Sequence, residues 1–174
     1  AQLVAGAALV SAWQQDSGVA RALADLPEVL QHAAAADWSA GVGALAGAER
    51  LYVLARGTGL PVAMEAALKF KEVCGIQAEA YSGAEAQHGA MALVEQGVPL
   101  LVLAPPGPAQ KGLLEVAAQM RQRGGAVLLA APPGTPGAQL PMVCSGNADL
   151  DPVSLVQSFY PMVEALARAR GLNP

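Results

Sequence analysis

Three charged residues recur at a spacing that would bring them together on a helix. Glu65, Lys69 and Glu72 are separated by four and then three residues, so their side chains would share one stripe of a helix surface. A carboxylate poised in such a stripe could serve as a general base in a proton transfer. The same spacing also fits a solvated stripe in which Glu65 and Lys69 form a weak ion pair, so both interpretations remain open here.

A histidine supplies the second candidate group. His88 precedes Gly89, which would place it at a turn with an accessible imidazole. The other histidine, His32, lies beside an alanine run in a helical segment, where we expect a structural role. From its position alone, His88 fits either a catalytic group or a structural residue.

The third candidate is a glycine turn. The sequence Gly57-Thr58-Gly59 follows Arg56 and an apolar run over 50–55, and it precedes a predicted helix. Glycines let backbone N–H groups approach an anion, and a helix N-terminus favours negative charge. The turn is neither a full GxGxxG nor a Walker sequence. It therefore fits an anion-binding loop or an ordinary tight turn between a strand and a helix.

Short apolar runs alternate with helical segments in the part of the chain that carries these residues. We expect strands over 50–55, 77–81, 99–104, 126–130 and 140–144, and helices over 61–74, 84–94, 111–123 and 151–170. The alternation is typical of an α/β fold with a doubly wound parallel sheet and helices on both faces. Ligands of such sheets gather at the carboxyl ends of the strands, which is where the glycine turn would lie.

At the beginning of the chain, the apolar residues recur at the spacing of a helix instead of that of a strand. We expect helices over 1–14, 18–35 and 38–46. Asp16 or Ser17 would cap the second helix, Pro27 would bend or split it, and Asp37 would cap the third. The first helix is apolar but too short to span a bilayer, so we interpret it as a buried or docking helix.

These patterns divide the chain into N-terminal helices over 1–48, which pack on or link to a domain over 49–174. The abrupt start at Ala1 and stop at Pro174 suggest a piece of a longer protein.

Composition narrows the classes of function. The 174 residues suit one domain, and 53% of them are hydrophobic but only 4% aromatic, which predicts a core of small aliphatic side chains. The net charge of −4 and the scattered basic residues predict no nucleic-acid partner, and no segment predicts a membrane partner. Cys74 and Cys144 fit no zinc or CxxC pattern. We expect two free thiols in a reducing compartment, hence a cytoplasmic protein, and no metal site.

Taken together, several segments resemble the sugar-isomerase (SIS) domain family. The resemblance rests on 65–72, 78–81, Glu85, 88–89 and 92–93, including their order and the sixteen-residue interval from Glu72 to His88. Within the family, the pattern is most similar to the second SIS domain of the glucosamine-6-phosphate synthases (glutamine–fructose-6-phosphate aminotransferases). It is also similar to the SIS-type glucosamine-6-phosphate deaminases.

The resemblance implies a flavodoxin-like three-layer fold, two SIS domains in each parent chain and a homodimer. It implies that Glu72 moves a proton between C1 and C2 of a hexose or hexosamine 6-phosphate. It also implies that His88 assists opening of the sugar ring, in the active site of the neighbouring subunit, and that Lys69 lies near the sugar. Candidate substrate-binding residues are Arg56, Gly57, Thr58, Gly59 and Glu65, and this chemistry requires no cofactor.

The sequence departs from the family in several ways. It has Gln87-His88-Gly89-Ala90 where the family has Lys-His-Gly-Pro, and Ala84 stands where the family has glycine. It also lacks the Ser/Thr-rich loop of the first SIS domain that holds the phosphate. We therefore expect this chain to supply part of an active site, for isomerase, deaminase or aminotransferase-related chemistry. A non-catalytic, sugar-phosphate-binding regulatory domain and a structural half of a dimer are the alternatives.

Overall fold

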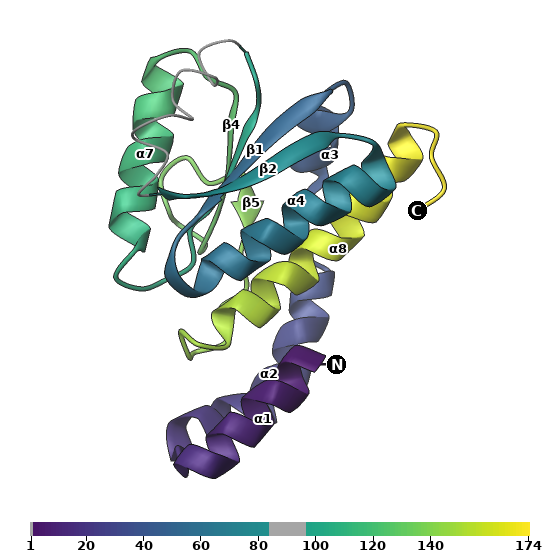
Figure 1. The fold of residues 1–174 in the computed structure, drawn as a ribbon. Helices are drawn as coiled ribbons and strands as arrows, with labels where there is room; N and C mark the ends of the chain where they lie inside the picture. Colours follow the sequence, from purple (N-terminus) through teal and green to yellow (C-terminus); the bar gives the residue numbers. More distant parts are fainter. Residues whose placement is uncertain (1, 84–96) are drawn as a thin grey trace.

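The structure, a computed structural model, describes residues 2–83 and 97–174 (Figure 1). Its five strands form one sheet in the order β2-β1-β3-β4-β5, and every neighbouring pair is parallel. The strands are β1 (Arg50–Ala55), β2 (Gln77–Ser82), β3 (Leu100–Leu103), β4 (Val127–Ala131) and β5 (Leu140–Pro141). Because β2 and β3 lie on opposite sides of β1, the chain reverses direction across the sheet at β1. This is the order of flavodoxin-like sheets, whose ligands bind at the carboxyl ends of the strands near the reversal.

The sheet is covered on both faces, which is why its central strands are apolar throughout. Every residue of β3 and β4 is buried, as expected for strands of a parallel sheet that lies between helices. Side chains alternate between the faces along β1, with Leu51 and Val53 in one core cluster and Tyr52 and Leu54 in the other.

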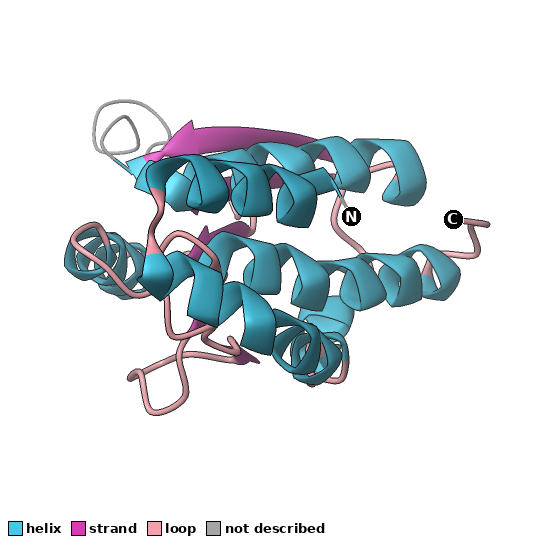
Figure 2. Ribbon diagram, turned by 90° about the horizontal axis from the view of Figure 1, so that it is seen from below, coloured by secondary structure: helices cyan, strands magenta, loops and turns pink. Residues whose placement is uncertain are grey.

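Helices form the outer two layers (Figures 1 and 2). The helices α4 (Leu60–Cys74) and α8 (Asp151–Ala169) pack together on one face, where the rings of Phe70 and Phe159 meet edge to face, with their centroids 5.3 Å apart. The helix α7 (Gln110–Gln122) covers the other face with Leu113 and Met120. The predicted doubly wound three-layer fold is confirmed.

The ends of α4 follow from local sequence. Pro61 lies in its first turn, where a missing N–H costs no helical hydrogen bond. Gly75 ends the helix in the left-handed region with a φ of 63°, and its N–H donates to the carbonyl of Phe70. Glycine reaches that conformation without the steric cost that a Cβ brings. The helix therefore runs from the carboxyl end of β1 back towards the start of β2.

The N-terminal helices are α1 (Gln2–Gln14), α2 (Ser17–Ala34) and α3 (Ser39–Leu45). The helix α2 contacts α8, and α1 packs along α2 at the bottom of Figure 1. Ser11 is the one buried residue of α1, and its large apolar side chains are exposed, namely those of Leu3, Leu9, Val10 and Trp13. The expectation of a buried helix is thus wrong for this chain. An apolar sequence drives burial only where another surface is available to cover it, so the docking alternative stands.

Other local expectations have mixed outcomes. Asp16 caps α2 by accepting hydrogen bonds from the N–H groups of Gly18 and Val19. Pro27 does not split that helix, because it lies on an exposed side where water can satisfy the freed carbonyl. The residue at the N-terminal cap of α3 is Trp38, although the Asp37 carboxylate accepts a hydrogen bond from the N–H of Ser39.

Two further expectations concern the later part of the chain. The edge strand β5 is shorter than the predicted 140–144, because its pairing with β4 ends at Pro141. The helix predicted over 84–94 lies outside the described residues.

Candidate functional site

The glycine turn connects β1 to α4. Arg56 is extended, Gly57 adopts a left-handed φ of 60°, and Gly57–Gly59 form a single 3-10 turn, η1. Arg56, Gly57 and Thr58 are exposed, whereas Gly59 is buried. A Cβ at Gly59 would lie 3.4 Å from the ring of Pro105 and 3.5 Å from the Cβ of Ala55, which are ordinary contact distances, so the turn packs closely on the sheet with room for a methyl group. The turn lies at the carboxyl edge of the sheet, as predicted.

The three charged residues of α4 form one connected stripe. The Nζ of Lys69 donates a hydrogen bond of 2.7 Å to Oε2 of Glu72 and lies 4.0 Å from Oε1 of Glu65. Their side chains are about a third to a half exposed, 32% for Glu65, 31% for Lys69 and 48% for Glu72. The hydrogen bond to Glu72 is the main reason that the pKa of Lys69 is raised, with further contributions from the charges of both carboxylates. Lys69 is therefore held as a cation between two carboxylates.

Burial of the opposite side of α4 fixes the direction of this stripe. Ala63, Ala66, Ala67 and Phe70 are buried against the sheet and α8. Since helical side chains three and four residues apart lie on one face, the charged stripe must face away from the core. Met64 and Leu68 on the same helix are also exposed, at 60% and 42%, and they form an apolar border beside the charged side chains.

A tyrosine on α8 joins the stripe. The hydroxyl of Tyr160 donates a hydrogen bond of 2.9 Å to Oε1 of Glu65, across 95 residues of sequence. Burial raises the pKa of Tyr160, and the hydrogen bond to Glu65 and its charge raise it further, so the hydroxyl remains a donor at neutral pH. Sequence reasoning missed this residue, because nothing in the pattern around Tyr160 indicates which side chain of α4 it would meet.

A cavity of about 580 Å³ lies beside these groups. Its walls come from α1, the glycine turn, the N-terminal halves of α4 and α8 and the segment just before α8, and they include Leu3, Thr58, Glu65, Asp149 and Tyr160. The cavity thus joins two predicted substrate-binding residues, Thr58 and Glu65, with the tyrosine that holds Glu65.

Glu72 lies at the opposite end of α4 from the glycine turn. Leu60 and Glu72 are twelve residues apart, and a rise of about 1.5 Å per residue separates them by about 18 Å along the helix axis. Glu65 is about one and a half turns into the helix, next to the turn, and Lys69 connects it to Glu72. His88, the second predicted catalytic residue, lies outside the described residues, as does Glu85.

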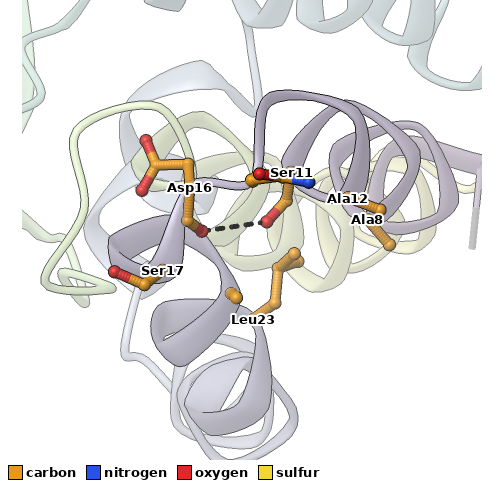
Figure 3. Close-up of a pocket in the computed structure, with 8 residues that line it drawn as sticks. Ala8, Ser11, Ala12, Asp16, Ser17 and Leu23 are labelled. Carbon is orange, nitrogen blue, oxygen red and sulfur yellow. Dashed lines mark hydrogen bonds between the residues drawn. The ribbon is translucent and has the colours of Figure 1, made fainter.

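A second hollow, of about 390 Å³, lies between α1 and α2 (Figure 3). It is formed by Ala8, Ala12 and Leu23 around the connection between the helices, where the hydroxyl of Ser11 donates to the carbonyl of Asp16 at 3.3 Å. It contains none of the predicted site residues.

Two observations bear on other kinds of site. The residues that the structure describes include no cluster of three or more histidine, cysteine, aspartate or glutamate side chains that could bind a metal ion. None of the helices in the described ranges is both long and apolar enough to cross a membrane. Both cysteines are free thiols, with Cys74 buried and Cys144 exposed, as predicted.

Comparison with known proteins decides the family. The model of the SIS domain matches residues 44–132, just over half of the chain. The chain belongs to the SIS-domain family. The match includes β1, α4 and β2, so the charged stripe and the glycine turn lie within the matched residues.

Relatives of this SIS domain include larger proteins. It is 39% identical over 138 residues to the glutamine–fructose-6-phosphate aminotransferase (isomerizing) of Aeropyrum pernix. This match covers 75% of this chain and 22% of that protein. The crystal structure of a proposed phosphosugar isomerase from Silicibacter pomeroyi has a TM-score of 0.89 and 44% identity, and covers 98% of this chain and 52% of the other. The C-terminal domain of a glucosamine-fructose-6-phosphate aminotransferase from Francisella tularensis shares the fold, with a TM-score of 0.75 at 23% identity over 91% of this chain and 48% of the other. The chain thus spans about a fifth of the first relative and about half of the second.

Proposed function

We propose that this SIS domain supplies the base for proton transfer in a phosphosugar isomerase or a related aminosugar-phosphate enzyme, with Glu72 as that base. The observation that carries the proposal is the exposed carboxylate of Glu72, held at 2.7 Å by the ammonium of Lys69. The relatedness to a proposed phosphosugar isomerase and to isomerizing aminotransferases supports the same class of reaction.

Aldose–ketose interconversion needs a group that removes a proton from one carbon and returns it to the neighbouring carbon. A carboxylate does this when a fixed partner orients it towards the carbon. Lys69 would orient Glu72, and its positive charge would stabilise negative charge that develops on the substrate oxygen as the proton leaves. His88 would assist ring opening, as the family resemblance implies, and the substrate would be a hexose or hexosamine 6-phosphate.

We further propose that the site is completed by a first SIS domain of the same parent chain and by a second subunit. Two exposed apolar features support a covering surface, namely Met64 and Leu68 beside the stripe and the large side chains of α1. A protein interface has an apolar core surrounded by a polar rim. The phosphate would be bound by the covering domain, while Arg56 and the glycine turn would contribute at the cavity.

Proton exchange tests the role of Glu72. The complete natural polypeptide is incubated with fructose 6-phosphate in D₂O, and deuterium uptake at C1 is followed by NMR. Loss of a general base costs about 10²- to 10⁴-fold in rate, so Glu72→Gln should reduce the uptake to about 1% or less. Glu115→Gln is a matched control, because Glu115 is also an exposed helical glutamate, 4.0 Å from a lysine. Uptake by Glu72→Gln at the rate of this control would contradict the proposal.

The cavity gives specific support to one alternative, a regulatory domain that binds a sugar phosphate without catalysis. Its volume lies beside the glycine turn and not beside Glu72. Saturable binding of fructose 6-phosphate, measured by calorimetry, without any deuterium uptake by the unmodified protein would favour that alternative.

A further inference from the structure

Tyr160 is fixed at the contact between α4 and α8. Its neighbour Phe159 is buried and packs against Phe70 of α4, and the rings of Phe159 and Tyr160 are 6.0 Å apart. The backbone of Tyr160 therefore belongs to a packed helix pair, while its side chain reaches the edge of the charged stripe. Such a side chain can hold a partner in place with little loss of its own freedom.

The hydrogen bond from Tyr160 is accepted by an oxygen atom that also lies near Lys69. It reaches Oε1 of Glu65, the same oxygen that lies 4.0 Å from the Nζ of Lys69. Two carboxylates thus flank one ammonium, but only one of them, Glu72, is within hydrogen-bond distance at 2.7 Å. The Glu65 carboxylate instead receives its hydrogen bond from the tyrosine, and its competition for Lys69 is reduced.

We propose that Tyr160 is a positioning residue, which holds Glu65 at a distance so that Lys69 remains on Glu72. The inference rests on the proposed function of Glu72 and adds a residue on a different helix to it. The chain of contacts also connects the cavity, whose wall includes Tyr160 and Glu65, with the base at the far end of the stripe. The hydroxyl can act throughout the neutral range, since burial and Glu65 both raise the pKa of Tyr160.

The first test is the Tyr160→Phe variant of the complete polypeptide in the deuterium-uptake assay with fructose 6-phosphate. Without the hydroxyl, Glu65 should attract Lys69 and loosen its hydrogen bond to Glu72. We expect kcat to fall about three- to tenfold, as for a base that is misplaced but present, with KM changed less than twofold. Tyr81→Phe is the control, because Tyr81 also donates to a glutamate, Glu79, on a strand. A kcat for Tyr160→Phe equal to that of the control would overturn the inference.

A double-mutant cycle separates positioning from a general loss of structure. In a Glu65→Gln background there is no competing carboxylate, so adding Tyr160→Phe should leave kcat unchanged. If Tyr160→Phe lowers kcat by the same factor in both backgrounds, Tyr160 does not act through Glu65 and the inference fails.

Crystal structures of the variant give a readout that does not depend on activity. In Tyr160→Phe, the Nζ of Lys69 should lie closer to Glu65 than to Glu72, the reverse of the present arrangement. An unchanged 2.7 Å contact with Glu72 would refute the inference. Loss of exchange in Glu72→Gln together with normal exchange in Tyr160→Phe removes only the role of Tyr160, whereas exchange retained in Glu72→Gln removes the proposed function itself.

Discussion

Arg170 connects three segments of the chain, and replacing it should destabilise the fold much more than its half-buried position near the end of the chain suggests. Its guanidinium donates to the carbonyl of Cys74 at 2.7 Å, to that of Ala46 at 2.7 Å and to that of Ala48 at 2.9 Å. These carbonyls lie at the end of α4, just after α3 and just before β1. Arg170 therefore fixes the end of α4 that carries Glu72.

The expected magnitude follows from the three bonds. A hydrogen bond to a charged group contributes about 1.5–3 kcal/mol when it is shielded from water, and partial exposure of these three reduces each to about 1 kcal/mol. Arg170→Ala should then lower the free energy of unfolding by about 3 kcal/mol. For a domain of this size, 1 kcal/mol corresponds to about 2–4 °C in Tm, so the expected fall is about 6–12 °C.

Thermal unfolding followed by circular dichroism measures this change directly. The neighbouring Arg168→Ala is a matched control, because Arg168 is 66% exposed and bonds only to Glu164 on the same helix among the contacts of the described residues. Such a pair is worth a few tenths of a kcal/mol. If Arg170→Ala lowers Tm by no more than Arg168→Ala, the three carbonyl contacts do not hold the segments together and the reasoning is refuted.

Two further predictions concern the core and the thiols. Phe70→Ala should cost about 3–5 kcal/mol, because Phe70 is fully buried against Phe159; a chemical-denaturation loss under 1 kcal/mol would contradict this. A disulfide reagent should label Cys144 in the folded chain but Cys74 only after unfolding, since Cys74 is buried and bonded to the carbonyl of Val163. Burial, and secondarily Asp151, raise the pKa of Cys144, so its labelling rate should still increase with pH above the usual thiol range; equal labelling rates for both cysteines would refute the assignment.

The elements that depend on local patterns were predictable. The runs that became β3 and β4 are apolar throughout, and burial on both faces of a parallel sheet requires that. The left-handed end of α4 at Gly75 and the cap at Asp16 depend on one or two neighbouring residues. The stripe of Glu65, Lys69 and Glu72 follows from helical spacing alone.

Contacts between distant segments could not be predicted in the same way. Nothing in the sequence around Tyr160 identifies Glu65 as its partner, because the pairing depends on the angle and register at which α8 packs on α4. The exposure of α1 could not be predicted either, since alanine, valine and leucine occur on all sides of this helix and no apolar face is distinguished from a polar one. The length of β5 depended on where β4 stops pairing.

The exposure of Glu72 fits the proposed covering surface. Water at a base competes with the substrate proton and weakens electrostatic stabilisation of a developing charge, so proton transfer at carbon favours a site that excludes water. Burying Glu72 and Lys69 permanently inside this domain would carry a large desolvation cost. Leaving the pair exposed at the surface, with Met64 and Leu68 beside it, would confine that cost to the proposed assembly, in which substrate groups and a covering surface would replace water. On this reasoning a covering surface should increase deuterium uptake without any change in this domain's own residues.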